Sequence, residues 1–186
     1  MRKLKGKIAI VGNGAGELGK KKGEEIDGHD YIFRFNNFST DGYETDYGEK
    51  ITHWVTTFWH DIPLRRGLDA KVVCPLPLND DRFVRGYHLQ KYHGGHNLHA
   101  VVSRGANCMP FELYEELLTF APWPSAGLMM IWWLYRSDRI PDVKLYGFDF
   151  FQNKRRCHYF DKSRNVTHHG ELEKLLVAGM FKLCVS

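Results

Sequence analysis

The sequence has few cysteines, no long hydrophobic run and no strong excess of charge, and each of these excludes a class of protein. No stretch approaches the roughly 18 apolar residues of a membrane span, and the run Ile8–Val11 after the basic start is too short for a signal-peptide core. The net charge of +4, from 26 basic and 22 acidic residues, is too small to favour nucleic-acid binding. We therefore expect a soluble protein of the cytoplasm.

The four cysteines are far apart and form no CxxC pair, which favours free thiols in a reducing compartment over a disulfide framework. They are Cys74, Cys108, Cys157 and Cys184.

What the sequence does have is the composition of an ordinary globular domain with many rings. Its 186 residues are 43% hydrophobic and 26% charged, which fits one well-buried domain over residues 1–186. Aromatic residues make up 14% of the chain and there are 10 histidines, so ring-lined pockets are expected.

Hydrophobic patterning predicts strands that alternate with helices. Short β-branched or aromatic runs predict strands at 7–11, 31–35, 53–58, 71–74, 98–102 and 143–147. Helices are expected at 110–120, at 125–137 with Ser125 as its N-cap, and at 171–183, with one or two helical turns within 17–25. The segment 61–95 gives no clear pattern. This order favours an α/β fold, a single Rossmann-like domain with a mostly parallel sheet flanked by helices.

A glycine-rich loop directly follows the first strand. Gly14, Gly16 and Gly19 form a GxGxxG pattern, so an NAD(P) site is one hypothesis. Two features weaken it, because a lysine run follows Gly19 and the second strand ends in Arg34 and Asn36 where a ribose-binding acid is expected.

Four further segments, in order along the chain, resemble the sialyl motifs of the family 29 sialyltransferases. The large motif corresponds to Val11–Gly14, Glu25–Asp30 and Phe33–Asn36, and the small motif to Pro124–Gly127 with Val143–Phe148. The third motif corresponds to His158–Asp161, and the very small motif to Thr167-His168 with Glu173. Residues 147–153 are also similar to the bacterial family 42 sialyltransferases.

The resemblance implies a GT-A-variant fold and an inverting, metal-independent transferase that uses a CMP-activated sialic acid or the related sugar Kdo. It places the donor site at Gly12, Asn13, Gly14, Asn36, Ser125, Ala126, Gly127, Gly147 and Phe148. Asparagine amides both donate and accept hydrogen bonds, and a helix start suits a carboxylate. The alternative is that the asparagines cap strand ends and Ser125 only caps its helix, which for Ser125 taken alone is favoured.

The resemblance also assigns the catalytic roles. His168 corresponds to the general base, with the adjacent His169 as the alternative base, and His158 and Tyr159 would stabilise the departing phosphate. Histidine suits a base because its pKa lies near neutrality.

Departures from the animal enzymes favour a bacterial-type cytosolic enzyme. No cysteine lies near Val11 or Ser125, Ala126 replaces the usual threonine, and we expect no transmembrane anchor before the domain. The acceptor would then be a glycan or glycolipid, such as a lipooligosaccharide or capsule precursor, with peripheral attachment at the inner membrane.

Three alternatives remain open. The chain could be a CMP-sugar-binding module with little turnover, an NAD(P)-binding protein, or a zinc enzyme. The last rests on His88, His93, His96 and His99, whose spacing fits no common zinc pattern. That segment is better interpreted as a loop near the acceptor, where Tyr87 and Tyr92 could stack on sugars.

Overall fold

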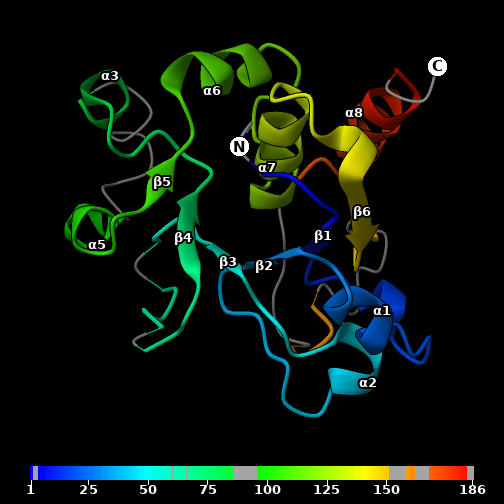
Figure 1. The fold of residues 1–186 in the computed structure, drawn as a ribbon. Coiled ribbons are helices and arrows are strands. Elements are labelled where there is room, and N and C mark those ends of the chain that lie inside the picture. Colours follow the sequence, from blue (N-terminus) through cyan, green and yellow to red (C-terminus); the bar gives the residue numbers. More distant parts are fainter. Residues whose placement is uncertain are drawn as a thin grey trace.

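The computed structural model describes residues 1, 4–59, 61–65, 67–85, 96–150, 158–161 and 168–183. A six-stranded sheet in the order β5-β4-β3-β2-β1-β6 forms its centre, and every pair of neighbours is parallel (Figure 1). The strands are β1 (Ile8–Val11), β2 (Tyr31–Phe35), β3 (His53–Val55), β4 (Lys71–Cys74), β5 (Asn107–Cys108) and β6 (Val143–Tyr146). The α-helices are α1 (Gly23–Asp27), α2 (Glu44–Tyr47), α3 (Asp81–Val84), α5 (Leu98–Ser103), α6 (Phe111–Leu118), α7 (Ala126–Tyr135) and α8 (Gly170–Leu183), and η1 (Ala15–Glu17) and η2 (Ile140–Asp142) are short 3-10 turns.

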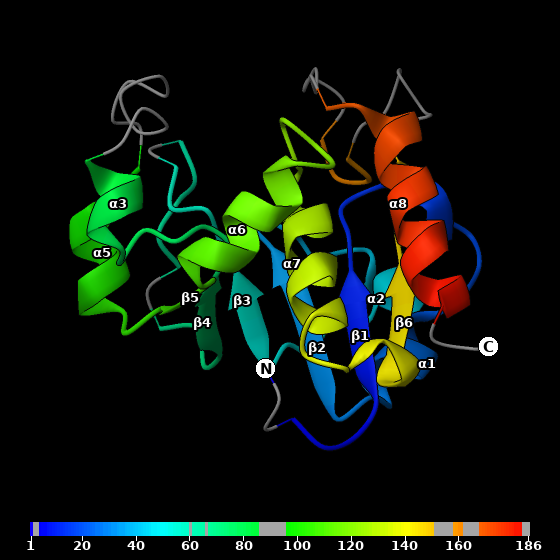
Figure 2. The ribbon, with the colours of Figure 1, turned by 90° about the horizontal axis from the view of Figure 1, so that it is seen from above.

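The residues of β1 show how the sheet divides the core into two. Because successive side chains of a strand point to opposite faces, Ile8 and Ile10 join a large apolar cluster with α7, while Ala9 and Val11 join a small one with α1 and α2. Helices α6, α7 and α8 therefore cover one face and α1 and α2 the other (Figures 1 and 2). Strands buried on both faces explain the unbroken apolar runs in the sequence.

The predicted parallel α/β fold is confirmed, and several elements have the predicted bounds. The strands at 31–35 and 71–74 match β2 and β4, whereas the strand expected over 53–58 ends at Val55. Helix α7 is buried on nearly all sides, and the Ser125 hydroxyl accepts from the Leu128 amide, which confirms Ser125 as its N-cap.

The strand predicted at 98–102 is wrong, because these residues form α5. The Asn97 side chain accepts from the Ala100 amide at 2.9 Å and caps that helix, and only Ala100 and Val101 of it are buried. The fifth strand is instead β5, which is only two residues long and is polar at Asn107, so hydrophobic patterning could not detect it.

Two of the cysteines lie side by side at the edge of the sheet. Cys74 and Cys108 are register partners on β4 and β5, and both are buried free thiols, as predicted. Cys157 and Cys184 lie outside the described residues. Within the part of the chain that the structure describes, no helix combines the length and apolar character needed to cross a membrane.

Candidate functional site

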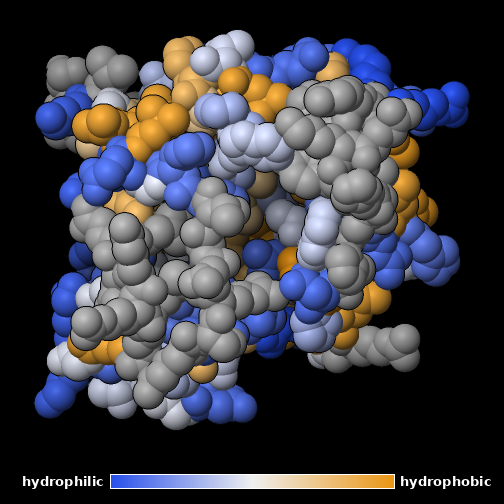
Figure 3. Space-filling view, turned by 180° about the vertical axis from the view of Figure 1, so that it is seen from behind, coloured by the Kyte–Doolittle hydropathy of each residue, from blue (hydrophilic) through white to orange (hydrophobic). Residues whose placement is uncertain are grey.

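The candidate site lies at the carboxyl edge of the parallel sheet, where the loops after β1, β2 and β6 meet. The chain runs outward from β1 to β5 and then returns to place β6 on the other side of β1, so the strand order reverses between β1 and β6. Such a reversal is where open α/β sheets bind ligands. Figure 3 views this edge from outside and shows a hollow near the centre of the face.

Two glycines of the first loop are required by contact between backbones. The Gly12 amide donates to Tyr146 at 2.8 Å and the Gly14 amide to Gly147 at 2.9 Å, which joins the loops after β1 and β6. A Cβ on Gly12 or Gly14 would lie 2.7 or 2.6 Å from the Gly147 carbonyl oxygen. Gly147 itself has a φ of +64°, which also favours glycine. Glycine is therefore needed at these positions because the two loops lie in contact.

The same loop lacks the helix that a dinucleotide site needs. Only the three-residue turn η1 follows Gly14, and the amides of Gly19 and Lys21 donate to the Asp46 carboxylate at 2.7 and 2.9 Å. These bonds lower the pKa of Asp46. Because the protein's own carboxylate occupies the anion-binding amides, the geometry gives the NAD(P) hypothesis no support.

Asn13 and Asn36 lie at the ends of the adjacent strands β1 and β2. The Asn13 side-chain amide donates to the Phe35 carbonyl at 3.3 Å, and Asn36, with φ of +48°, accepts from the Thr57 amide at 3.3 Å. Both therefore fix strand ends. Among the described residues, however, the buried side-chain oxygens of Asn13 and Asn37 have no hydrogen-bond partner. A buried acceptor without a donor favours a ligand at this edge.

Ser125 binds a carboxylate that belongs to the protein itself. Its amide donates to one oxygen of Glu173 at 2.7 Å, and its hydroxyl donates to the other at 2.6 Å. Glu173, near the start of α8, is only 3% exposed. In this structure Glu173 thus occupies the start of α7, where the sequence predicted the sugar carboxylate of the donor.

The environment of Glu173 pulls its pKa in two directions. Burial raises the pKa of Glu173 and prevails over the Ser125 hydrogen bonds and the nearby His168 and His169, which lower it. A positive charge on either candidate base would therefore favour the ionised form of Glu173, the residue that fixes α7 to α8.

His168, the predicted base, is half-buried beside the segment that leads into α7. Its Nδ1 lies 3.2 Å from the Trp123 carbonyl oxygen. Because a carbonyl only accepts, this contact assigns the ring proton to Nδ1 and the lone pair of a neutral imidazole to Nε2. His169 is exposed, and its carbonyl accepts from the Glu173 amide within the first turn of α8.

Tyr159 is a packed residue of the small core. It is 1% exposed, its ring lies parallel to that of Tyr47, and its hydroxyl donates to the Ser39 carbonyl. Its predicted role at the departing phosphate stays a prediction. The preceding His158 is half-buried and stacks on Phe160 at 5.3 Å, and its predicted role stays a prediction.

Phe148 links the remaining predicted donor residues. Its ring lies where a Cβ on Gly127 or Gly12 would fall, at 2.8 and 3.1 Å, and it contacts the Phe35 ring edge-on at 6.3 Å. Ala126 is the half-buried first residue of α7. The glycine at 127 thus lets the loop after β6 lie against the start of α7.

The histidine-rich segment is only partly described. His88 and His93, with Tyr87 and Tyr92, lie outside the described residues. His96 bonds through Nδ1 to the Thr57 carbonyl at 2.7 Å, and His99 is exposed on α5. Within the described ranges, no three His, Cys, Asp or Glu side chains are grouped so as to hold a metal ion.

Comparison with known proteins agrees with the large motif, which contributes Asn13 and Asn36 to this edge. Residues 5–60 match the model of glycosyltransferase family 29 (sialyltransferase), a segment that runs from β1 through β3. Over this segment the chain is similar to the family 29 sialyltransferases.

Individual relatives match over the same short segment. The chain is 44% identical over 48 residues to the mouse (Mus musculus) alpha-N-acetylgalactosaminide alpha-2,6-sialyltransferase 2, which is 26% of this chain and 13% of that enzyme. It is 43% identical over 47 residues to the chicken (Gallus gallus) CMP-N-acetylneuraminate-beta-galactosamide-alpha-2,3-sialyltransferase 1, covering 25% and 14% of the two chains.

A solved structure extends the likeness of fold to nearly the whole chain. A mammalian sialyltransferase in complex with Gal-beta-1-3GalNAc-ortho-nitrophenol superposes with a TM-score of 0.64 and 18% identity, over 96% of this chain and 66% of the other. At that identity the likeness supports the fold alone. The chain spans about two thirds of the solved enzyme's length.

No role was predicted from the sequence for two buried residues that lie behind this edge, Arg34 and Tyr47. Arg34 is 0% exposed and donates to the carbonyls of Tyr47 and Lys50 at 2.7 and 3.0 Å. Tyr47 is also fully buried, at the end of a four-residue helix that no periodicity reveals. An arginine within a β-strand of otherwise apolar residues was the one available signal.

Proposed function

We propose that this chain transfers sialic acid from CMP-sialic acid to a hydroxyl group of a glycan. One observation carries the proposal. The segment that matches the family model, residues 5–60, contains β1 and β2, and Asn13 and Asn36 follow these strands at the carboxyl edge of the sheet. Because α7 leads into a strand parallel to β1, its first residues lie at that same edge, and the Ser125–Glu173 pair brings the start of α8 there too.

The proposed chemistry is direct displacement at the anomeric carbon with inversion. His168, through Nε2, would take the proton from the acceptor hydroxyl as that oxygen attacks. The CMP phosphate would leave from the opposite side, with His158 stabilising its developing charge. We propose a metal-independent reaction, as the resemblance to the family 29 enzymes implies.

The names of the relatives suggest which acceptor sugars to propose. The mouse and chicken relatives act, by their names, on an alpha-N-acetylgalactosaminide and a beta-galactosamide. We therefore propose acceptors that end in galactose or N-acetylgalactosamine. A cytoplasmic enzyme acting on lipooligosaccharide or capsule precursors at a membrane surface remains the competing proposal, and Kdo the competing donor sugar.

The test is CMP release from CMP-sialic acid, measured with and without Galβ1-3GalNAc, and repeated with CMP-Kdo and a lipooligosaccharide acceptor. We expect acceptor-dependent release with CMP-sialic acid that persists in chelator. CMP binding without release would instead favour the binding module, and loss of release in chelator would favour the zinc enzyme.

The base is tested by His168→Ala, which should lower kcat by about 100-fold or more. His99→Ala is the matched control, because His99 is an exposed histidine on α5 to which no catalytic role is assigned. If His169→Ala abolishes transfer and His168→Ala does not, the assignment moves to His169.

A further inference from the structure

A stacked pair of tyrosines lies directly behind the candidate donor loop. The rings of Tyr47 and Tyr159 are 3.8 Å apart and only 15° from parallel, and both side chains are buried. Tyr43 contacts the Tyr159 ring edge-on at 4.9 Å. The pair therefore joins α2 to the segment 158–161, which is distant in the sequence.

The Tyr47 hydroxyl bonds to both ends of the turn after β1. It donates to the Gly14 carbonyl at 2.6 Å and accepts from the Glu17 amide at 3.2 Å. The Glu17 carboxylate in turn accepts from the Gly147 amide at 3.2 Å. One phenol oxygen thus holds the turn after β1, and the Glu17 side chain of that turn contacts the loop after β6.

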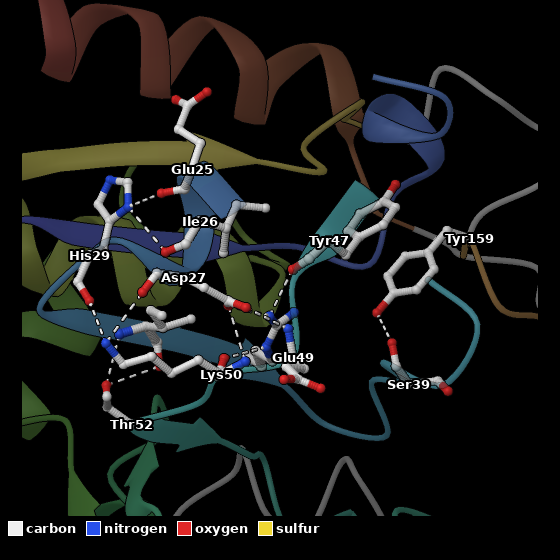
Figure 4. A network of polar contacts seen from close by, with 12 residues as sticks. Glu25, Ile26, Asp27, His29, Ser39, Tyr47, Glu49, Lys50, Thr52 and Tyr159 are labelled. Atoms are coloured by element: carbon white, nitrogen blue, oxygen red, sulfur yellow. Dashed lines mark hydrogen bonds and ion pairs between the residues drawn. The ribbon is translucent and has the colours of Figure 1, made fainter. Parts of the chain in front are cut away.

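Tyr159 bonds to the residue just before this turn. Its backbone amide donates to the Asn13 carbonyl at 2.8 Å, while its hydroxyl donates to Ser39 in the loop after β2 (Figure 4). The stack therefore fixes Asn13 and Gly14 from one side and the segment that carries His158 from the other.

The stack is itself anchored to the sheet. Arg34 of β2 donates to the Tyr47 carbonyl at 2.7 Å, and Asp27 accepts from the amides of Glu49 and Lys50 at 3.0 Å each (Figure 4). Tyr47 is thus held at its backbone, its ring and its hydroxyl. A residue fixed in three ways transmits its position to the groups that it bonds.

We infer that Tyr47 is a positioning residue that sets the affinity for the CMP moiety by holding Asn13 and Gly14 in place for the donor. This inference rests on the proposed function. Tyr47 would contact no ligand itself and would act through the loop after β1, which would contact the donor.

The test is Tyr47→Phe, which keeps the stacked ring and removes only the hydroxyl. Loss of both bonds leaves the Gly14 carbonyl and the Glu17 amide without this partner, so we expect CMP affinity by calorimetry to fall about 5- to 20-fold. The KM for the CMP-sugar should rise by a similar factor, with the acceptor KM unchanged.

Tyr43→Phe is the matched control, because Tyr43 packs against the same ring but its hydroxyl makes no hydrogen bond among the described residues. It should leave CMP affinity within twofold of the unmodified protein. Unchanged CMP affinity in Tyr47→Phe, or an equal loss in both variants, would overturn the inference. A fall in melting temperature above about 10 °C in Tyr47→Phe would also overturn it, because the role would then be structural.

Hydrogen exchange separates this inference from the proposed function. The Glu17 amide should exchange faster in Tyr47→Phe than in Tyr43→Phe, whether or not the protein turns over a CMP-sugar. If the unmodified protein neither binds CMP nor releases it from CMP-sialic acid, the proposed function fails and so does the donor role of Tyr47. Faster exchange of the Glu17 amide in Tyr47→Phe would then support only the hydrogen bond between Tyr47 and the turn after β1.

Discussion

At the scale of single residues, the Ser125–Glu173 pair does the most to define the candidate site. One serine side chain caps α7 by accepting from Leu128 and also donates to a buried carboxylate. The sequence predicts the cap, since serine before an apolar helical run is a common start signal. It also contains Glu173, but nothing in the spacing shows that this carboxylate meets Ser125, because 48 residues separate the two.

The first prediction concerns the stability that Ser125 provides. Ser125→Ala should lower the free energy of unfolding by roughly 2–3 kcal/mol, because α7 loses its cap and one oxygen of buried Glu173 loses its donor. Chemical denaturation measures the change.

Ser103→Ala serves as its control, since that exposed hydroxyl donates only to a carbonyl of its own helix. It should cost less than about 0.5 kcal/mol. Equal losses in the two variants would show that the Glu173 contact contributes nothing.

At the scale of elements, the loops after β1 and β6 depend on backbone contacts that admit no side chain. The GxGxxG pattern correctly marks a tight loop after a buried strand, yet its three glycines differ in environment. Gly14 faces the Gly147 carbonyl, whereas nothing lies within 4 Å of a Cβ placed on Gly16. A sequence pattern cannot separate them, because the neighbour that matters comes from a distant strand.

The second prediction uses this difference. Gly14→Ala should cost roughly 2–4 kcal/mol of stability and weaken CMP binding, because its Cβ would lie 2.6 Å from a backbone oxygen. Gly16→Ala, two residues along the same loop, should be neutral in both assays. Thermal melting and calorimetry on the pair are the measurements. If Gly16→Ala is as harmful as Gly14→Ala, the close contact between the loops after β1 and β6 is not the reason for glycine at position 14.

The elements also show where local patterning fails. Val101 and Val102 suggested a strand, but Val102 is 80% exposed on α5 and only the side toward the core is buried. Two β-branched residues in a run of five do not distinguish a strand from a short helix. The cap at Asn97 and the packing of the neighbouring strands decide between them.

At the scale of the whole molecule, burial of polar groups between sheet and helices makes stability depend on pH. His53 of β3 is 5% exposed and stacks on Phe33 at 4.3 Å, and burial lowers the pKa of His53 from 6.5 to about 4. The folded state therefore binds a proton less readily than the unfolded state. The stability from neutral His53 is present above pH 6.5 and is lost as the pH falls toward 4.

The third prediction follows from this sign. Between pH 7 and pH 4.5 the free energy of unfolding should fall by roughly 2 kcal/mol through His53. His53→Gln, which cannot titrate, should flatten that part of the profile. Urea denaturation at several pH values gives the measurement, and a slope that is identical in the two proteins would rule out His53 as the group responsible.

The sequence by itself determined the α/β class, most of the strands and helices, and the family-like motifs, because strand runs, caps and glycine loops are encoded by neighbouring residues. Only the tertiary structure decided which of these residues meet. It placed Glu173 against Ser125, buried Tyr159 against Tyr47, and directed Gly14 toward Gly147. Such contacts join residues that are far apart in the chain. They depend on the order in which the parallel strands associate and on which face of the sheet each helix covers.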